Sequence, residues 1–575
     1  MNRLRVLQIS ALTVVAALFV SCGGLNTMLK DAPQVTYSVK PSPLEMRGDS
    51  VEVTITGQYP AKFFNKKAVM DVTPVLKWEG GEQAFSTQKL QGEAVEANAT
   101  IIAFETGGSF TYTAKIGYQD AMDISQLMIR AKASVKDKSI DFPELKIADG
   151  VISTPKLAHM TAQEIEAVHQ FKVRESMTNS ADLLFAINQA VLKPNEVKKS
   201  QIEALKTLLA QIPADKDMEL MSVKVSGYAS PDGAQNNNQK LADKRKTTAE
   251  SFMNSELKKV DKTKAKDFVQ TEATAEDWDG FKQLMAASNI QDKEQILRVL
   301  EINSDLDVRE QEIKKMSQVY KEIADQVLPQ LRRSKLNVNV DKIGKTDSLL
   351  VILSQQDSIS DTLNVEEYLK AATLVTENDT KIKILTKASS IHPSEWRVYN
   401  NLGCVLYKAN RLDEAEVALK KADELSEGNT MCKNNLGAVA FKKGDKAKAI
   451  EYFELAAGAG KAVSQNQAMI KIKEGDYQTA VNLLGSDQSF NAALAKLLNG
   501  DVDGALSTIT AAEDPNDALG YYLKAIIGAR KANTDLIFTN LRTAVTKDAT
   551  LAAKAKKDLE FAKYFEDQTF KSIVQ

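Results

Sequence analysis

Apolar and polar residues alternate along several short stretches in the first third of the chain. The clearest examples are QVTYSVKP, SVEVTITGQY, ATIIAFET, SFTYTAKIGY and QLMIRAKASVK, with glycine, aspartate and asparagine residues between them. Such alternation places every second side chain on one buried face, which is typical of antiparallel strands. Residues 34–158 are therefore predicted to form an all-β sandwich.

The spacing changes near residue 160, where TAQEIEAVHQF has a helical period. The strand DLLFAINQAVL then leads through Lys193-Pro194-Asn195 into the amphipathic helix KKSQIEALKTLLAQIP. A strand (MELMSVKV), a turn between two glycines, a helix with Arg245 and another strand (DFVQTEATAEDW) follow. Two or three helices are expected at about 278–332, before the alternating RRSKLNVNVDKIG. Residues 160–345 are predicted to be an α/β domain with a helical insertion.

From residue 365 to 575 the period is helical throughout, and one unit recurs. YNNLGCVLYKANRLDEAEVALKKA returns as KNNLGAVAFKKGDKAKAIEYFELA, with Leu402-Gly403 and Leu436-Gly437 34 positions apart. KEGDYQTAVNLL and LNGDVDGALSTI are weaker copies, and TLAAKAKKDLEFAKYFED is a final helix that would cover the last apolar face. The pattern predicts an all-α solenoid, since a fixed period near 34 residues indicates stacked helix pairs.

The first residues are not expected to belong to the fold. MNRLR is basic, and the apolar run after it is short for a membrane span. The run ends in FVSCGG, which resembles the lipobox of bacterial lipoproteins, in which the cysteine becomes lipid-modified. The resemblance implies a signal peptide over residues 1–21, acylation of Cys22, and a short tether over 22–33. An ordinary secretory signal is the alternative.

The strand spacing of residues 34–158 suggests a sandwich of the immunoglobulin-like type.

The order of elements in the α/β domain, with LKPNE and with GYASPDGAQNNNQKLADKR at 227–245, carries a resemblance to the C-terminal domain of the OmpA family. It implies an α/β sandwich that binds the stem peptide of peptidoglycan through an aspartate at the turn and the arginine on the next helix. Arg245 occupies the arginine position and Asn238 fits the pattern. Ser230 stands where the family has aspartate, and Asp232 is a candidate to replace it.

Two readings of this domain stay open. In the first, Arg245 offers a bidentate guanidinium to a peptide carboxylate, helped by N–H groups at the helix N-terminus. In the second, Arg245 is a solvated helix residue on a retained scaffold.

The repeats resemble tetratricopeptide repeats, whose small residues let paired helices approach closely. The resemblance implies that Arg397, Asn401 and Asn435 face a binding surface for an extended peptide, whose backbone the two asparagines could bind. The alternative is that these are surface polar residues on a stacking scaffold.

The composition and the motif spacing argue against several classes of function. The net charge of −2 argues against a nucleic-acid protein. No HExxH or CxxC spacing is present, so no metal site, cofactor or enzymatic centre is predicted. We expect a non-enzymatic lipoprotein, anchored by its acyl chains in the outer membrane and facing the periplasm. It would associate with peptidoglycan and scaffold an unidentified protein or peptide partner. The alternative is a docking component of a secretion or surface-fibre machine whose OmpA-like domain no longer binds peptidoglycan.

Overall fold

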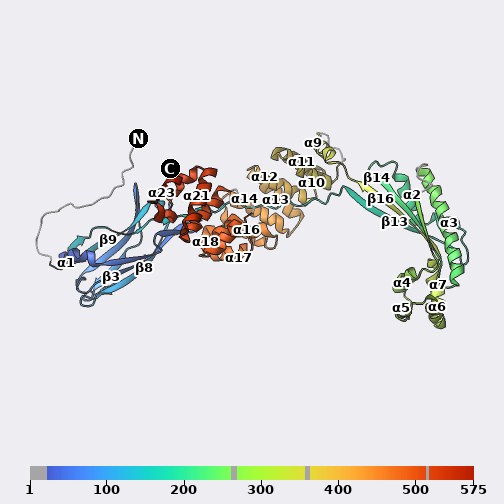
Figure 1. The fold of residues 1–575 in the computed structure, drawn as a ribbon, viewed down its shortest axis with the longest axis horizontal. Coiled ribbons are helices and arrows are strands. Elements are labelled where there is room, and N and C mark those ends of the chain that lie inside the picture. Colours follow the sequence, from blue (N-terminus) through green and yellow to red (C-terminus); the bar gives the residue numbers. More distant parts are fainter. Residues whose placement is uncertain (1–22, 261–267, 357–362, 513–516) are drawn as a thin grey trace. The chain divides into compact units, whose positions relative to one another are not determined.

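The computed structural model describes residues 23–260, 268–356, 363–512 and 517–575 (Figure 1). The predicted signal peptide and the proposed lipid attachment point, Cys22, lie outside these residues. Contacts divide the chain into two compact units. One combines residues up to 166 with residues 406–575, and the other is residues 167–405.

The N-terminal region is rich in β-strands, as predicted, and consists of two sheets. The first has the order β1-β3-β2-β12 with β8 on β3, and the second has the order β10-β9-β4-β6-β7 with β11 on β9 and β5 on β4. Val51, Val53 and Ile55 alternate with polar residues along β3 and have no exposed surface, so the period of two does bury one face. The strands are β1 (Thr36–Lys40), β2 (Leu44–Arg47), β3 (Ser50–Tyr59), β4 (Val69–Trp78), β5 (Gly81–Ala84), β6 (Gln88–Gly92), β7 (Thr100–Ile102), β8 (Gly108–Gly117), β9 (Ser125–Val135), β10 (Lys138–Asp141), β11 (Leu145–Asp149) and β12 (Val151–Ile152), with short 3-10 turns η1 (Ala32–Gln34), η2 (Asp120–Asp123) and η3 (Thr154–Leu157).

The residues expected to be a tether are instead part of this fold. Gly23–Asp31 forms helix α1, and its Leu25 and Met28 are buried in the sandwich core. An apolar i, i+3 pair on a short helix is stabilised by the core that it covers, which a sequence window cannot show. The described part of the predicted tether is therefore a packed element.

Strand β4 was not among the strands predicted from the sequence, and it contains a proline. Pro74 lies inside this strand and cannot donate a backbone hydrogen bond. The strand pairs with β6 through residues 69–72 and with β5 through residues 75–78, so Pro74 falls where the partner changes. A proline at that position costs little, because the missing N–H has no place in either pairing.

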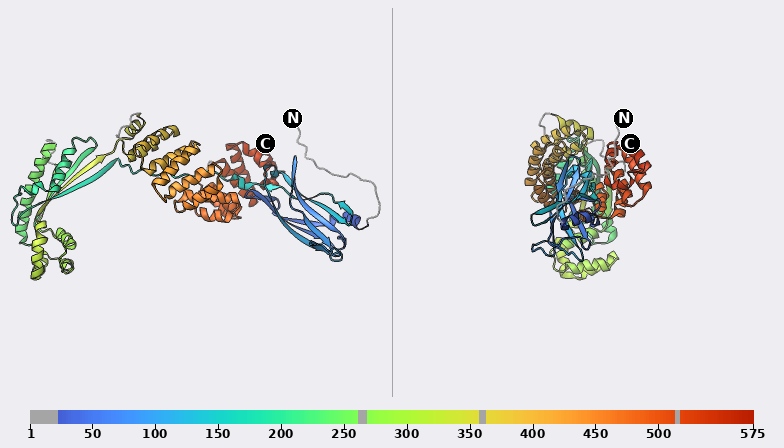
Figure 2. Two further views of the ribbon diagram at one scale, coloured as in Figure 1. Left: turned by 180° about the vertical axis from the view of Figure 1, so that it is seen from behind. Right: turned by 90° about the vertical axis from the view of Figure 1, so that its left-hand side faces the viewer.

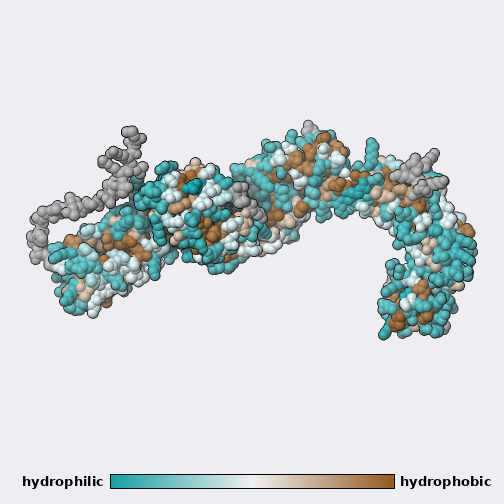
Figure 3. All heavy atoms as spheres, viewed as in Figure 1, coloured by the Kyte–Doolittle hydropathy of each residue, from teal (hydrophilic) through white to brown (hydrophobic). Residues whose placement is uncertain are grey.

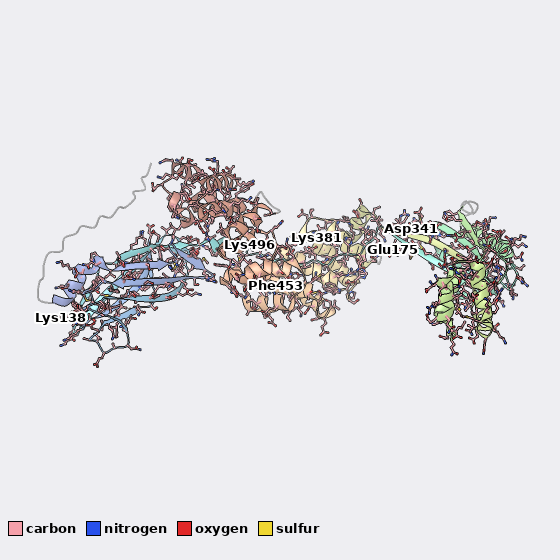
Figure 4. The ribbon with its side chains drawn as sticks, turned by 60° about the horizontal axis from the view of Figure 1, so that its bottom comes forward. Lys138, Glu175, Asp341, Lys381, Phe453 and Lys496 are labelled. Atoms are coloured by element: carbon pink, nitrogen blue, oxygen red, sulfur yellow. The ribbon has the colours of Figure 1, made fainter. Side chains whose placement is uncertain are left out.

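The second unit is built on a four-stranded sheet of order β13-β16-β14-β15, in which β14 and β15 are parallel and the other pairs antiparallel. Its strands are β13 (Arg174–Leu184), β14 (Met218–Tyr228), β15 (Val269–Thr274) and β16 (Arg333–Ile343). Helices α2 (Ser200–Gln211) and α3 (Gln235–Val260), with the short turn η4 (Glu196–Lys198), pack their apolar residues onto it. Figure 4 marks Glu175 and Asp341 on the neighbouring strands β13 and β16, and Figure 2 shows α3 beside the sheet from behind.

Three expectations for this unit need correction. Residues 161–171 form no helix, and β13 ends at Leu184, before much of the stretch predicted as a strand. The insertion contains five helices among the described residues, rather than two or three, with a hydrophobic core of their own. Short polar loops divide one apolar pattern into α4 (Trp278–Ala287), α5 (Lys293–Ile302), α6 (Leu306–Lys315), α7 (Ser317–Gln326) and α8 (Leu328–Leu331).

The remaining residues are helical, and most helices come in antiparallel pairs. They are α9 (Asp347–Gln355), α10 (Val365–Thr373), α11 (Asn378–Ile391), α12 (Trp396–Lys408), α13 (Leu412–Leu425), α14 (Thr430–Lys442), α15 (Lys446–Leu455), α16 (Lys461–Glu474), α17 (Tyr477–Leu484), α18 (Phe490–Leu498), α19 (Val502–Thr510), α20 (Ala518–Arg530) and α21 (Thr534–Lys547). The stretch expected to be one final helix, residues 550–567, instead contains α22 (Thr550–Ala555) and the 3-10 turn η5 (Leu559–Tyr564), and α23 (Gln568–Val574) follows it.

The sequence explains how the pairs turn. In GD at 444–445 the glycine has φ +86°, and the Asp445 side chain accepts the N–H of Lys448 as the cap of the next helix. Gly475-Asp476 does the same. Inside a pair, a Cβ on Gly437 would lie 2.6 Å from the ring of Phe453, which is fully buried (Figure 4). The small residue therefore sets the close approach of α14 and α15.

Within the first unit, the sandwich contacts the helical repeats directly. The turn between β2 and β3 holds Arg47, whose Nε donates to the carbonyl of Gly475 at 3.0 Å, and Gly48, at φ +59°. A Cβ on Gly48 would lie 2.9 Å from the carbonyl of Glu474. The tripeptide RGD at 47–49 thus joins the sandwich to the α16–α17 turn, and its glycine is required by both the φ angle and the close approach.

A carboxylate pair near the C-terminus makes stability depend on pH. Asp558 accepts hydrogen bonds from the hydroxyl of Tyr522 at 2.8 Å and from the N–H of Glu560 at 3.1 Å. Glu560 pairs with Arg530 and accepts from Thr154 at 2.6 Å. Burial, followed by the charge of Glu560, raises the pKa of Asp558 to about 6 from 3.8. The folded state therefore favours the protonated carboxyl.

We expect Asp558→Asn to stabilise the protein at pH 7 by about 1–3 kcal/mol, because a shift of one pKa unit corresponds to about 1.4 kcal/mol. The raised folded pKa means that the wild type loses stability as the pH rises from about 4 to 6. The advantage of the variant should shrink towards pH 4. Urea unfolding of both proteins across this range tests it, and an unchanged difference between pH 4 and 7 would contradict it.

Candidate functional site: a row of asparagines

Four asparagines on successive first helices of the repeats bind the backbone of the chain itself. Three of them lie in the first unit: Asn435 on α14, Asn466 on α16 and Asn491 on α18. We call these three, with Asn401 on α12 in the second unit, the asparagine row. The residues that they bind belong to 159–170, which we call the bound segment. Each asparagine and the residue that it binds lie in the same unit.

Each asparagine holds both backbone groups of one residue. The Oδ1 of Asn435 accepts the N–H of Ile165 at 2.7 Å, and its Nδ2 donates to the carbonyl of Ile165 at 2.8 Å. Asn466 holds Gln163 in the same way, at 2.7 and 2.8 Å. Asn491 holds His159, at 2.8 and 2.9 Å.

The pattern requires an extended backbone. In an extended chain the N–H and C=O of one residue point to the same side, and the groups of its neighbours point away. Residues 163 and 165 are two apart and bind successive asparagines, so the period is that of a strand. The helix predicted for TAQEIEAVHQF is therefore wrong for a physical reason: its backbone groups are bound by asparagine amides in place of i→i−4 partners.

A second asparagine in the repeat orients the first. Asn434 donates to the Oδ1 of Asn435 at 3.1 Å and to the carbonyl of Gln163 at 2.9 Å, and its own Oδ1 accepts from Asn466 at 2.9 Å. Asn434 has no exposed surface, and Asn435 and Asn466 are 1% exposed. Buried amides with every partner satisfied fix one geometry, because any other leaves polar groups unpaired.

Side chains of the repeats also bind the bound segment, in part through ion pairs. Lys408 bonds Glu166 at 2.6 Å and Glu164 at 2.9 Å. Burial lowers the pKa of Lys408, but the bonds to Glu166 and Glu164 outweigh it and the net shift is upward. The hydroxyl of Tyr407 donates to the carbonyl of Ala162 at 3.0 Å, and burial together with Glu164 raises the pKa of Tyr407 to about 12. Ala162 itself is 1% exposed, so no larger side chain fits there without rearrangement.

The second unit repeats the motif. Asn401 accepts the N–H of Ala167 at 2.7 Å and donates to its carbonyl at 2.9 Å. The guanidinium of Arg397 pairs with Glu395 at 2.9 Å and with Glu366 at 2.7 Å, and these bonds raise its pKa. Glu366 in turn accepts the N–H of Gln170. Arg397 therefore positions a carboxylate, while Asn401 binds backbone.

The α/β domain buries the arginine of the predicted peptidoglycan-binding site. Arg245 has no exposed surface. Its Nε donates to the carbonyl of Gln189 at 3.1 Å, and its two Nη atoms donate to the carbonyls of Tyr228 at 2.9 Å and Ala186 at 3.4 Å. Burial, and then the charge of Arg332, lowers its pKa to about 10. The guanidinium is therefore used inside the domain, and it is not the solvated residue of the second reading either.

The turn before α3 is closed by its own contacts. The hydroxyl of Ser230 donates to a carboxylate oxygen of Asp232, and Asp232 lies 3.5 Å from the guanidinium of Arg332. Asn238 donates to the carbonyl of Gly233 at 2.8 Å and so fixes the turn. The structure brings Ser230, Asp232 and Asn238 together at one turn, and it assigns Asp232 a cationic partner within the chain.

One known protein family matches part of the helical region. Residues 397–429 and 432–459 match the sequence profile of the Tetratricopeptide repeat family. These segments are tetratricopeptide repeats. No curated protein is significantly similar to the chain.

Several solved structures resemble parts of it at low TM-scores. They include the APC/C hetero-tetramer Cut9-Hcn1 (14% identity, 40% of this chain and 46% of that chain, TM-score 0.32), YrrB, described as a TPR protein with an unusual peptide-binding site (22% identity, 37% and 100%, TM-score 0.21), and PilW, described as a type IV pilus biogenesis factor (14% identity, 40% and 100%, TM-score 0.28). The matched part is under half the length of the Cut9-Hcn1 chain.

Two residues of the asparagine row, Asn401 and Asn435, were named from the sequence, and Asn466 and Asn491 were not. Asn466 and Asn491 lie in weak repeat copies, where the LG pair is absent. A positional signal does exist: each row asparagine precedes by nine positions a residue with positive φ, at 410, 444, 475 and 500. Counting back from the GD turns would have identified both. Tyr407 and Lys408 had no such signal.

Among the described residues, the chain offers little for other kinds of site. No helix there is long and apolar enough to cross a membrane. No group of three or more histidine, cysteine, aspartate or glutamate side chains in those residues could hold a metal ion. Cys404 and Cys432 are both buried, and neither forms a disulfide within the described part of the chain.

Proposed function

We propose that the protein is a non-enzymatic scaffold of the cell envelope, whose tetratricopeptide repeats bind extended polypeptide by its backbone. One observation carries this: Asn435 and Asn466 each hold the N–H and the C=O of a single residue. Such contacts suit peptide binding and supply no nucleophile or general base. In this chain the ligand is its own bound segment, so the repeats bind the stretch that joins the sandwich to the α/β domain in sequence.

The cellular location belongs to the same proposal. The sequence FVSCGG supports acylation at Cys22 and anchoring in the outer membrane, with the protein facing the periplasm. The order strand, helix, strand, helix, strand, insertion, strand in residues 174–343 supports an OmpA-like domain. An anchor at one end and a wall-related domain in the middle suit a protein that organises partners between membrane and wall.

A second candidate function is favoured by Arg245. Three backbone carbonyls already use its guanidinium, and Asp232 is paired with Arg332. A stem peptide would have to replace these bonds, while Ser230 offers no carboxylate for its ammonium group. This favours a docking component of a secretion or surface-fibre machine, with an OmpA-like domain that no longer binds peptidoglycan.

We expect the chain from residue 23 to stay in the supernatant when purified peptidoglycan is sedimented. Pull-down of an OmpA-family domain that keeps both the aspartate and the arginine is the positive control. Wild-type protein that pellets with the wall, and is released when Asp232→Asn is introduced, would contradict the second candidate. It would restore peptidoglycan as the ligand, because Asp232 would then be its ammonium partner.

A further inference from the structure

The sandwich contains a cavity of about 420 Å³ at one end of its core. One wall is the last turn of α1 and the turn η1, which contribute Leu29, Lys30 and Pro33. The opposite walls come from β1 and β9 and from the loop before β11, with Phe142 at the rim. The volume lies in the range of ~300–1,000 Å³ that is usual for small-molecule sites.

The floor of the cavity, by which we mean its most buried lining residues, is mainly apolar. Tyr59, Phe63 and Met70 are 4%, 3% and 1% exposed. The hydroxyl of Tyr59 is 3.2 Å from that of Tyr37 and contacts the sulfur of Met70, so the polar atoms at the floor are paired with one another. A ligand that enters therefore meets hydrocarbon and aromatic surface, which favours an apolar chain over a polar molecule.

The mouth differs from the floor. Leu145, at the rim, is 45% exposed and adds apolar surface to the mouth of the cavity. Glu144 is held by Lys77 at 2.5 Å and by Arg130 at 2.9 Å, so its negative charge is already neutralised. Lys30 is exposed at the end of α1. In Figure 3 hydrophobic residues of the sandwich reach the surface among hydrophilic ones. The mouth thus combines an exposed apolar rim with a cation.

We propose that this cavity binds a single acyl chain, with the hydrocarbon on the floor and an anionic head group near Lys30. The proposal does not depend on acylation of Cys22 or on the function of the repeats. It assigns a role to α1, which otherwise only covers the end of the core. A free fatty acid and a bilayer lipid share this chemistry.

The test uses the chain from residue 23, which contains every described element. Displacement of a fluorescent fatty acid by saturated acids of 10 to 16 carbons should give one site per chain. Affinity should rise about fourfold per methylene group until the cavity is filled, since burying one CH₂ is worth ~0.8 kcal/mol. Lys30→Gln should weaken the binding of hexadecanoic acid but leave the binding of hexadecanol unchanged.

Two variants test whether the acyl chain binds in the cavity or elsewhere on the surface. Ala131→Leu fills it and should weaken binding at least tenfold; Leu29→Gln makes its wall polar and should do the same if Ala131→Leu disturbs folding. Ala84→Leu, the same change at an exposed site on β5, is the matched control. Binding only to phospholipid vesicles, lost in both cavity variants, would identify a bilayer lipid as the source. Absence of binding to both probes, or equal binding by all variants, overturns the proposal.

Discussion

Asn435→Ala is expected to free the centre of the bound segment. The substitution leaves the N–H and the C=O of Ile165 without their amide partners and removes the acceptor of Asn434. Each lost bond to a buried group costs about 1–3 kcal/mol. We therefore expect the amides of Gln163 and Ile165 to exchange with deuterium at least tenfold faster than in the wild type, because local opening becomes that much easier.

Two further variants sharpen this prediction. Asn435→Asp keeps an acceptor for the N–H of Ile165 but cannot donate to its carbonyl, and it adds a negative charge to a segment that carries Glu164 and Glu166. Its effect should equal or exceed that of alanine. Asn482→Ala, at an exposed position on α17, should change nothing. Equal exchange in Asn435→Ala and Asn482→Ala would mean that the asparagine contributes little to holding the segment.

Arg245→Ala is expected to destabilise the α/β domain itself. Three carbonyls from the segments 186–189 and 228 lose their donors at a site with no exposed surface. At about 1–3 kcal/mol for each unsatisfied group, the domain should lose at least ~3 kcal/mol. Proteolysis in increasing urea, followed by mass spectrometry of peptides from residues 174–343, measures this loss in one domain of a larger chain.

Arg298→Ala and Arg245→Lys are the controls for this measurement. Arg298 is exposed on α5, so its removal should change stability by less than ~0.5 kcal/mol. A lysine keeps the charge but cannot reach three carbonyls in different directions, so Arg245→Lys should recover only part of the loss. If Arg245→Ala is as stable as the wild type, the arginine is not a structural residue, and a role in binding a ligand becomes the better explanation.

Patterns with a local cause were predictable from sequence. The period of two in SVEVTITGQY gives β3, because alternate residues meet one core. The alternation in KLNVNV likewise gives β16. The 34-residue spacing of the two LG pairs identifies helix pairs, since the small residues are needed wherever α14 meets α15. The same repeat unit contains Asn401 and Asn435, which bind backbone groups of the bound segment.

The rest depended on contacts between distant residues. Nothing in TAQEIEAVHQF reveals that asparagines 270 and 303 positions later accept its N–H groups, and those bonds replace the helix that its spacing favours. The burial of Leu25 and Met28 needs the finished sandwich. Arg245 lies on a polar helix pattern, and its burial becomes apparent only when the carbonyls of residues 186, 189 and 228 converge on it.

The central claim is that the repeats bind residues 159–170 of their own chain through backbone contacts. Residue-resolved hydrogen–deuterium exchange of the wild-type chain tests it most directly. We predict strong protection of the amides of Gln163, Ile165 and Ala167, which lie outside any helix or strand. The amides of Glu164 and Glu166 should be less protected, since alternate N–H groups of an extended chain point away from the row. Uniformly fast exchange along the segment, or the continuous protection of a helix, would contradict the account.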